Sequence, residues 1–174
     1  GMLMKYFRND PDFPKIPEGV KFSPGVQNLG PDANEYRGHS GKILDGDNTG
    51  VSISTFTAHS SPLGLVFDTK GALSDEFKGD GFVLRNTLGA KSSLMKPFTD
   101  QGRDLLHLDM SYDKGSDNYF VKTTRIVDSF NNPTDAVLIG NSLYIIEYDA
   151  KAGSIWKVTL PAGSKKVKKV RKKK

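Results

Sequence analysis

Cysteine is absent from the 174 residues of this chain, and long hydrophobic runs are absent as well. Without cysteine the chain can form neither disulfides, nor thiolate metal sites, nor a cysteine nucleophile. No apolar stretch approaches the ~20 residues that a membrane-spanning helix needs, and no apolar segment follows the first residues as it would in a secretion signal. The lack of cysteine leaves the cellular compartment open, because periplasmic and cytosolic β-proteins can both do without it.

Acidic residues are missing from the C-terminal end, where positive charge is concentrated. Residues 164–174 hold eight of the 25 lysines and arginines, so the rest of the chain carries 17 basic against 20 acidic residues. A run of like charges repels itself, and we expect a disordered, solvated polybasic tail. A weak anchor for nucleic acid or anionic lipid is the functional alternative. Specific nucleic-acid binding is not expected, since no aromatic residue is interleaved for base stacking.

Glycine and proline, by contrast, are plentiful, with 18 and 9 residues, and they favour short strands and turns over long helices. Five of the prolines lie between residues 11 and 31. Neither a helix nor a central strand can run far through such a segment. The sequence therefore predicts an irregular, proline-rich region over residues 1–50, with one short strand at Val20–Phe22.

Residues 51–163 have the pattern of a β-protein. Val51–Phe56 alternates apolar and polar residues, as a half-buried strand does, whereas Leu63–Phe67 is continuously apolar, as a strand buried on both faces would be. Turn residues separate the further strands that we expect, which are Gly81–Arg85, Asp104–Met110, Tyr119–Val127, Thr134–Ile139, Leu143–Ile146 and Ser154–Leu160.

These strands repeat as a unit. Four of them lie between residues 62 and 127, and a similar set begins at residue 134 and stops after three. Repeated four-stranded units are typical of propeller blades. The sequence thus predicts an all-β fold with about two β-propeller-type blades over residues 51–163. The last unit lacks a fourth, outer strand, which Val20–Phe22 or a segment outside this chain would supply.

Several of these segments resemble glucose/sorbosone dehydrogenase-like proteins. His59-Ser60-Ser61-Pro62-Leu63-Gly64 is similar to the opening of a late blade in that family. Asn132–Val137 and Gly140–Tyr148 resemble the opening of its last blade, and Gly153–Val158 resembles the closing strand. The resemblance covers residues 50–160, and the order and spacing of the segments carry it.

The resemblance implies a six-bladed propeller that oxidises sugars with pyrroloquinoline quinone, usually together with calcium, in the periplasm or outside the cell. The catalytic histidine of the family lies in an early blade, which has no counterpart here. The family's arginines that bind the quinone carboxylates lie on the loop opening the last blade, and this loop reads Asn131-Asn132-Pro133-Thr134 here. We therefore name no catalytic residue.

Two functions remain open at this point. In the first, the chain is the C-terminal part of a sugar dehydrogenase-like propeller that is inactive alone, with the remaining blades, or further copies of itself, as partners. In the second, it is a non-catalytic propeller segment that binds a carbohydrate or a partner protein. Two blades cannot close a ring and expose an apolar sheet face at each end, which favours self-association. The alternative is a monomer in which residues 1–50 fold over one of these faces.

Two residues are candidates for cofactor binding. His59 precedes an expected strand, where it could accept a proton or bind substrate; the alternative is a histidine that caps a turn. Arg85 ends a strand before a loop where family members direct a cation toward the cofactor; the alternative is a surface arginine.

Two acidic residues are candidates for lining a channel or substrate site. Asp135 and Glu147 start and end adjacent strands, where they could line the channel mouth or hold a cation, or could accept hydrogen bonds from turn amides. No metal site is predicted. Asp45–Gly50 resembles half of a calcium loop, but Phe56 occupies the position of its last ligand, so an Asx turn is the better interpretation. Trp156 is expected to anchor the core of the last sheet.

Overall fold

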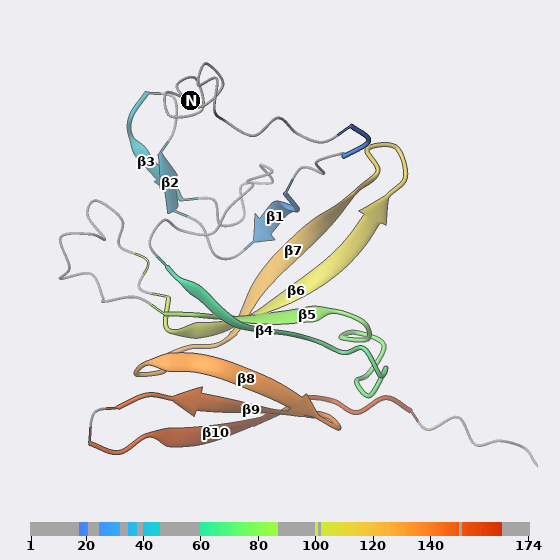
Figure 1. Ribbon diagram of the computed structural model, residues 1–174. Coiled ribbons are helices and arrows are strands. Elements are labelled where there is room, and N and C mark those ends of the chain that lie inside the picture. The colour runs from blue at the N-terminus through green and yellow to red at the C-terminus, as the bar shows by residue number, and fades with distance from the viewer. Residues whose placement is uncertain are drawn as a thin grey trace, which may run out of the picture.

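The computed structural model describes an all-β protein built from three sheets (Figure 1). The described residues are 18–20, 25–31, 35–37, 40–45, 60–86, 100, 102–149 and 151–164. None of them lies in a helix, so this part of the chain contains no helix that could span a membrane. The expected all-β class is therefore confirmed for these residues.

Four antiparallel strands form a meander in the largest sheet, called sheet 1 here. Its strands are β4 (Pro62–Phe67), β5 (Gly81–Arg85), β6 (Asp104–Asp113) and β7 (Asn118–Val127), and each pairs with the next. This is the set of four strands that the sequence predicts between residues 62 and 127. A fifth strand, β1 (Gln27–Pro31), adds to β7 in parallel.

The last three strands form a separate antiparallel meander, called sheet 2. They are β8 (Pro133–Ile139), β9 (Ser142–Glu147) and β10 (Ser154–Thr159), in the order predicted from residue 134 onward. Within the described residues β10 has only β9 as a neighbour. The outer strand expected at Val20–Phe22 lies mostly outside the described residues, and β1, further along the chain, extends sheet 1.

Three short strands occupy the segment for which the sequence predicts an irregular region. Besides β1, these are β2 (Glu35–Arg37) and β3 (Ile43–Asp45), which pair with each other. Some predictions fall outside the described residues. Among them are the strand at Val51–Phe56, most of Val20–Phe22, nearly all of the polybasic tail, and His59.

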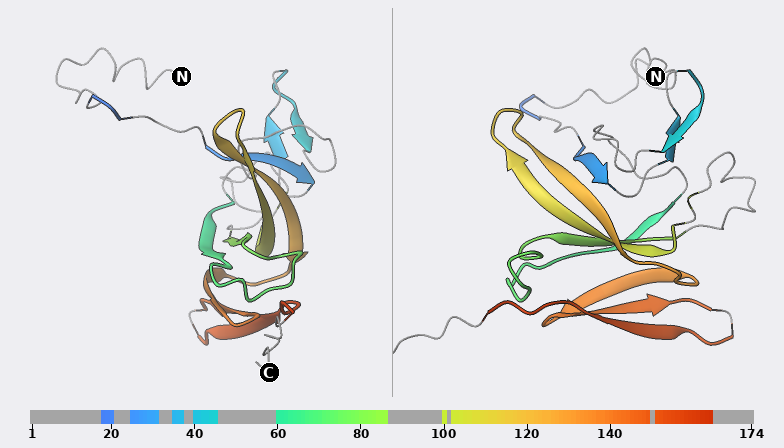
Figure 2. Two further views of the ribbon diagram at one scale, coloured as in Figure 1. Left: turned by 90° about the vertical axis from the view of Figure 1, so that its right-hand side faces the viewer. Right: turned by 180° about the vertical axis from the view of Figure 1, so that it is seen from behind.

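The main core lies between the two sheets, which form two layers in both views of Figure 2. The first strands of the two sheets, β4 and β8, run beside each other at this interface. Gly64 of β4 has a φ of +56°, and a Cβ added there would lie 2.9 Å from both Ala136 N and Asp135 Cα of β8. The buried members of this core are Leu73, Phe77, Phe82, Leu84, Leu105, Phe130, Leu143, Ile145 and Leu160.

Two burial predictions are wrong, and both concern edge strands. Leu65 and Phe67 of β4 are exposed, because β4 ends sheet 1 and has one paired neighbour; all five residues of β5 are buried instead. Trp156 is 52% exposed rather than a core anchor. It lies on β10, the edge of sheet 2, where the ring has nothing beyond it in the described residues to complete its burial.

Candidate functional site

Four charged side chains meet at one end of sheet 1. Arg85 is the last residue of β5 and pairs in register with Asp104, the first residue of β6. Arg125 lies on β7, the next strand over, and Asp100 lies shortly before β6. Because antiparallel neighbours bring the end of one strand beside the start of the next, residues far apart in the sequence form one cluster here.

Arg85 is held by two carboxylates. Its Nε donates to Asp104 Oδ1 at 2.9 Å and its Nη2 to Asp104 Oδ2 at 2.5 Å, a bidentate pair. Its Nη1 donates to Asp100 Oδ2 at 2.7 Å. Both the Arg85 and the Asp104 side chains are fully buried. The surface-arginine alternative is therefore wrong.

Arg125 completes the cluster from the solvent side. Its Nε donates to Asp104 Oδ2 at 2.7 Å and its Nη2 to Asp100 Oδ1 at 3.1 Å, and its side chain is 35% exposed. The backbone amide of Asp100 donates to Glu35 Oε2 at 2.7 Å, which ties the cluster to the β2–β3 hairpin. Two guanidinium groups thus oppose two carboxylates, and their charges balance.

Electrostatics keep Arg85 charged despite its position. Burial lowers the pKa of Arg85, but the hydrogen bonds and the charges of Asp104 and Asp100 raise it by more, so that the net shift is upward. Arg85 therefore carries its positive charge at any ordinary pH.

A polar cleft of about 490 Å³ opens beside this cluster. It lies between the start of β6, the end of β7 and the connection from β7 to β8, and it is lined by Asp100, Gly102, Arg103, Arg125, Asp128, Ser129, Phe130 and Asn131. The Phe130 amide donates to the Arg103 carbonyl at 3.0 Å. This hydrogen bond joins the segment before β6 to the connection from β7 to β8. Arg103 and Ser129 have φ angles of 58° and 64°, a conformation that non-glycine residues seldom adopt.

Glu147, at the end of β9, forms hydrogen bonds with the connection from β7 to β8 and with β10. Its Oε1 accepts from the Asn131 amide at 2.5 Å and its Oε2 accepts from Trp156 Nε1 at 2.7 Å. The Trp156 ring meets Phe130 edge to face, with centroids 6.5 Å apart. Of the two roles considered for Glu147, the structure shows the turn-amide contact, with the indole as a second donor.

The predicted site residues that the structure describes do not share one place. Arg85 lies in the ion cluster beside the cleft, and its neighbour Asn86 donates from its Nδ2 to Asn132 Oδ1 of the β7–β8 connection. Glu147 contacts that connection separately, through the Asn131 amide. Asp135 is exposed on β8 and accepts from the adjacent Ala136 amide at 2.8 Å. His59 lies outside the described residues. Cofactor binding by Arg85 and His59 stays a prediction.

Sequence reasoning missed the carboxylates and the second arginine of the cluster. The sequence pattern places Asp104 and Arg125 within strands without pairing them, and Asp100 belongs to no predicted element. The sequence does show a charged residue at the end of one apolar strand, Arg85, and at the start of the next, Asp104. A charged side chain that is buried at a strand end needs a partner of opposite charge. The sequence alone does not show which charged residues form pairs, because this depends on how the strands pair.

The cluster does not fit the quinone and calcium that the family resemblance implies. A quinone carboxylate approaching Arg85 would meet the carboxylates of Asp100 and Asp104, which already neutralise the guanidinium. A calcium ion approaching those carboxylates would be repelled by Arg85 and Arg125. Elsewhere in the described residues, no group of three or more His, Asp or Glu side chains is placed to hold a metal.

Comparison with models of protein families, with curated proteins and with solved structures finds no match for this chain. The geometry of the cleft and the order of the strands are therefore the features from which a function can be inferred.

Proposed function

We propose that this chain supplies two blades of a propeller of the glucose/sorbosone dehydrogenase kind, acting in the periplasm or outside the cell, and that its own role is to bind a carbohydrate in the polar cleft rather than to perform catalysis. The observation that carries the proposal is the cleft itself: carboxylate and guanidinium groups are held at its wall by the buried Arg85–Asp104 pair. A rigid polar wall can bind hydroxyl groups without losing much conformational entropy.

The chemistry of the cleft suits a polyhydroxylated ligand. A sugar hydroxyl both donates and accepts, so it can donate to Asp128 or Asp100 while it accepts from Arg125. Phe130, a buried core residue that meets Trp156 edge to face, closes the cleft on the side of the core. A cleft of about 490 Å³ has the size of a small-molecule site.

The arrangement of the two sheets supports the propeller part of the proposal. Two consecutive antiparallel meanders pack face to face, and their first strands, β4 and β8, are neighbours. In a propeller the first strand of each blade lies near the central axis, so first strands of consecutive blades lie side by side. A close approach at Gly64, where no side chain separates β4 from β8, suits such a position.

Titration of the purified chain with glucose, other aldoses and polyols, followed by calorimetry or by ligand-observed NMR, tests the proposal. We expect binding in the millimolar range or tighter. Asp128→Asn, which changes one exposed cleft carboxylate outside the ion cluster, should weaken it about tenfold, since a hydrogen bond to a charged group is lost. Asp149→Asn, an exposed carboxylate that accepts from the Lys151 amide, is the matched control.

Two outcomes would count against carbohydrate binding. One is the absence of any saccharide signal at concentrations well above the millimolar range, and the other is equal binding by Asp128→Asn and the wild-type chain. A dye-linked assay with added pyrroloquinoline quinone and calcium separates binding from catalysis. We expect no turnover above a cofactor-only blank.

A further inference from the structure

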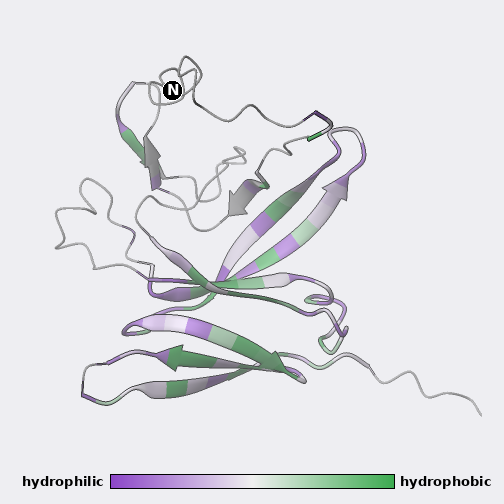
Figure 3. Cartoon of the chain, viewed as in Figure 1, coloured by the Kyte–Doolittle hydropathy of each residue, from purple (hydrophilic) through white to green (hydrophobic). Residues whose placement is uncertain are grey.

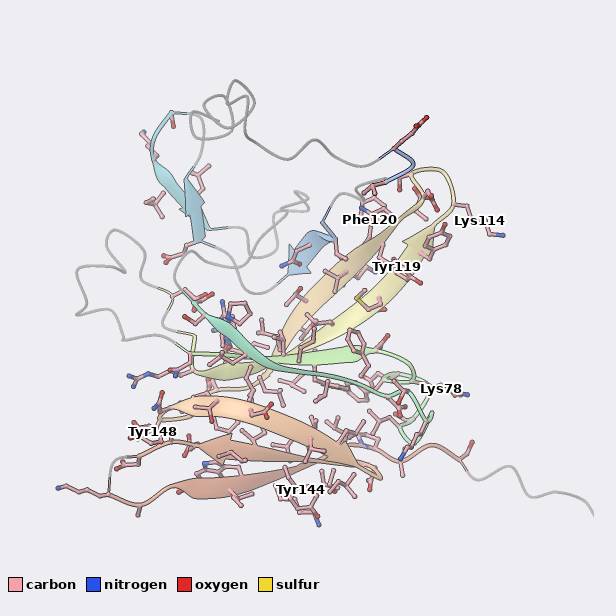
Figure 4. The ribbon with its side chains drawn as sticks, viewed as in Figure 1. Lys78, Lys114, Tyr119, Phe120, Tyr144 and Tyr148 are labelled. Carbon is pink, nitrogen blue, oxygen red and sulfur yellow. The ribbon has the colours of Figure 1, made fainter. Side chains whose placement is uncertain are left out.

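The face of sheet 2 that points away from sheet 1 is apolar and exposed. In the register of β8, β9 and β10, the residues that alternate outward are Val137 and Ile139, Tyr144 and Ile146, and Ile155. The four aliphatic side chains among them are between 50 and 71% exposed. Figure 3 shows the apolar stretch along β9 and the end of β8, and Figure 4 shows Tyr144 on the side remote from sheet 1. These five residues are called the outer face.

The corresponding outward face of sheet 1 is covered. Val83, Leu106, Leu108 and Val121 form a second apolar cluster on that side, and each is 8% exposed or less. Of the two outward sheet faces that the structure describes, one is therefore closed and one is open. A head-to-tail ring of copies would need both faces open, whereas a two-fold pair needs only one, because the same patch serves both partners.

We propose that the outer face binds the outer face of a second copy of this chain, forming a two-fold dimer. The face needs a partner that is itself a flat, apolar sheet surface, and a second copy presents one of identical chemistry. The dimer does not depend on carbohydrate binding, because the cleft lies at the β7–β8 connection and not on the outer face. It uses the face that a further propeller blade would cover, so it is the state of the chain when no such blade is bound.

Charge on the outer face fits this pairing. Asp135 lies on β8 and Lys157 on β10, and both alternate outward with the apolar residues. A two-fold axis running along β9 places β8 of one copy over β10 of the other. Asp135 then lies opposite Ile155 of the partner's β10, two residues along the strand from Lys157. Aligned sheets pack about 10 Å apart, and the long lysine side chain can reach the aspartate along the diagonal between these two levels. The symmetry makes this ion pair twice.

Lys157 is positioned for such a contact. Its Nζ lies 5.9 Å from the centroid of the Tyr144 ring, over the outer face rather than out in solvent. The ammonium group is therefore held next to the apolar residues that the second copy would cover, and Asp135 stands at the opposite edge of the same face.

Sedimentation velocity or light scattering of the 174-residue chain across a dilution series tests the dimer. We expect a concentration-dependent monomer–dimer equilibrium. Val137→Lys and Ile146→Lys should each raise the dissociation constant about 100-fold, because every substitution places two buried charges in a symmetric interface. Tyr119→Lys, at an exposed aromatic on the β6–β7 hairpin remote from sheet 2 (Figure 4), should leave the dissociation constant unchanged.

A charge-swap cycle tests the orientation of the two copies. Asp135→Lys and Lys157→Asp should each weaken the dimer about fivefold, since a rim ion pair contributes modestly but occurs twice. The double variant D135K/K157D should restore most of the lost affinity. Circular dichroism of each variant checks that the fold is kept, and the two apolar variants provide independent tests should one of them fail to fold.

Three results would overturn the proposal. A monomeric mass at every concentration would exclude the dimer. A dimer that Val137→Lys and Ile146→Lys leave intact but Thr159→Pro abolishes would show edge-to-edge pairing through β10 instead. Failure of the double charge swap to restore affinity would exclude the two-fold axis along β9.

Discussion

Arg85 and Asp104 face each other across the β5–β6 register with both side chains fully buried, and two hydrogen bonds of 2.9 and 2.5 Å join them. An ion pair in this position is costly to desolvate and is retained only when its hydrogen bonds are satisfied. Here Asp100 and Arg125 provide the remaining partners. The pair therefore links the end of sheet 1 to the wall of the cleft.

Arg85→Met should destabilise the chain by about 3–5 kcal/mol, because it leaves the buried Asp104 carboxylate without its bidentate partner. Urea unfolding followed by circular dichroism gives the value. Arg125→Met should cost clearly less, since that side chain is partly exposed. The double variant R85M/D104L should be more stable than Arg85→Met alone, and a double variant that is less stable would contradict the unpaired-charge explanation.

Gly64→Ala should cost about 3 kcal/mol or more, because it combines a left-handed backbone conformation with a collision against β8. Gly140→Ala is the matched control. Its φ of +59° is nearly the same as the +56° of Gly64, but nothing lies within 4 Å of the added Cβ. We therefore expect Gly140→Ala to lower the free energy of unfolding by only about 1 kcal/mol. The difference between the two free energies of unfolding measures the contact between β4 and β8. Equal losses would show that this contact is absent.

Trp156→Phe should lower the free energy of unfolding by about 1–2 kcal/mol. The substitution removes the indole N–H that donates to Glu147 Oε2, and a buried acceptor that loses its donor costs about this much. The half-exposed ring should also fluoresce between the limits of a buried and a fully hydrated indole and be quenched by acrylamide at an intermediate rate. A blue-shifted, unquenched emission would instead indicate the core anchor that the sequence predicted.

Tyr112 should titrate above its usual range. Its hydroxyl donates to Asp117, and this hydrogen bond is the largest cause that raises the pKa of Tyr112. A raised pKa in the folded state means that the folded chain holds this proton more tightly. The stability that this hydrogen bond contributes is therefore present below the ordinary tyrosine pKa. It is lost as the pH rises through the pKa of Tyr112 in the folded chain. Asp117→Asn should lower the pKa of Tyr112, as ring-labelled NMR would show; an unchanged pKa would remove Asp117 as the cause.

The strand order could be predicted from the sequence because alternation and turn residues are local properties. Each strand from Pro62 to Thr159 lies where the pattern places it, and the change from four strands to three is also visible in the chain. The short strand β1 was not predicted, because its pairing with β7 joins segments that are distant in the sequence. Among prolines and glycines such a strand has no pattern of its own.

The candidate site could be predicted only in part. The positions of Arg85 and Glu147 at strand ends single them out in the sequence; Arg85 lies in the ion cluster beside the cleft, and Glu147 contacts the β7–β8 connection. Their partners Asp104, Asp100, Asn131 and Trp156 could not be assigned, because a residue type does not reveal its neighbour across a sheet.

Sequence by itself determined the all-β class, the two successive meanders and the concentration of positive charge at the C-terminal end, since these follow from residue periodicity and composition. Only the tertiary structure decided which strands form edges, which charges are buried together and which apolar sheet face stays open. Burial and ion pairing depend on what packs against a residue, and strand pairing brings together residues such as Arg85 and Asp104 that the chain keeps apart.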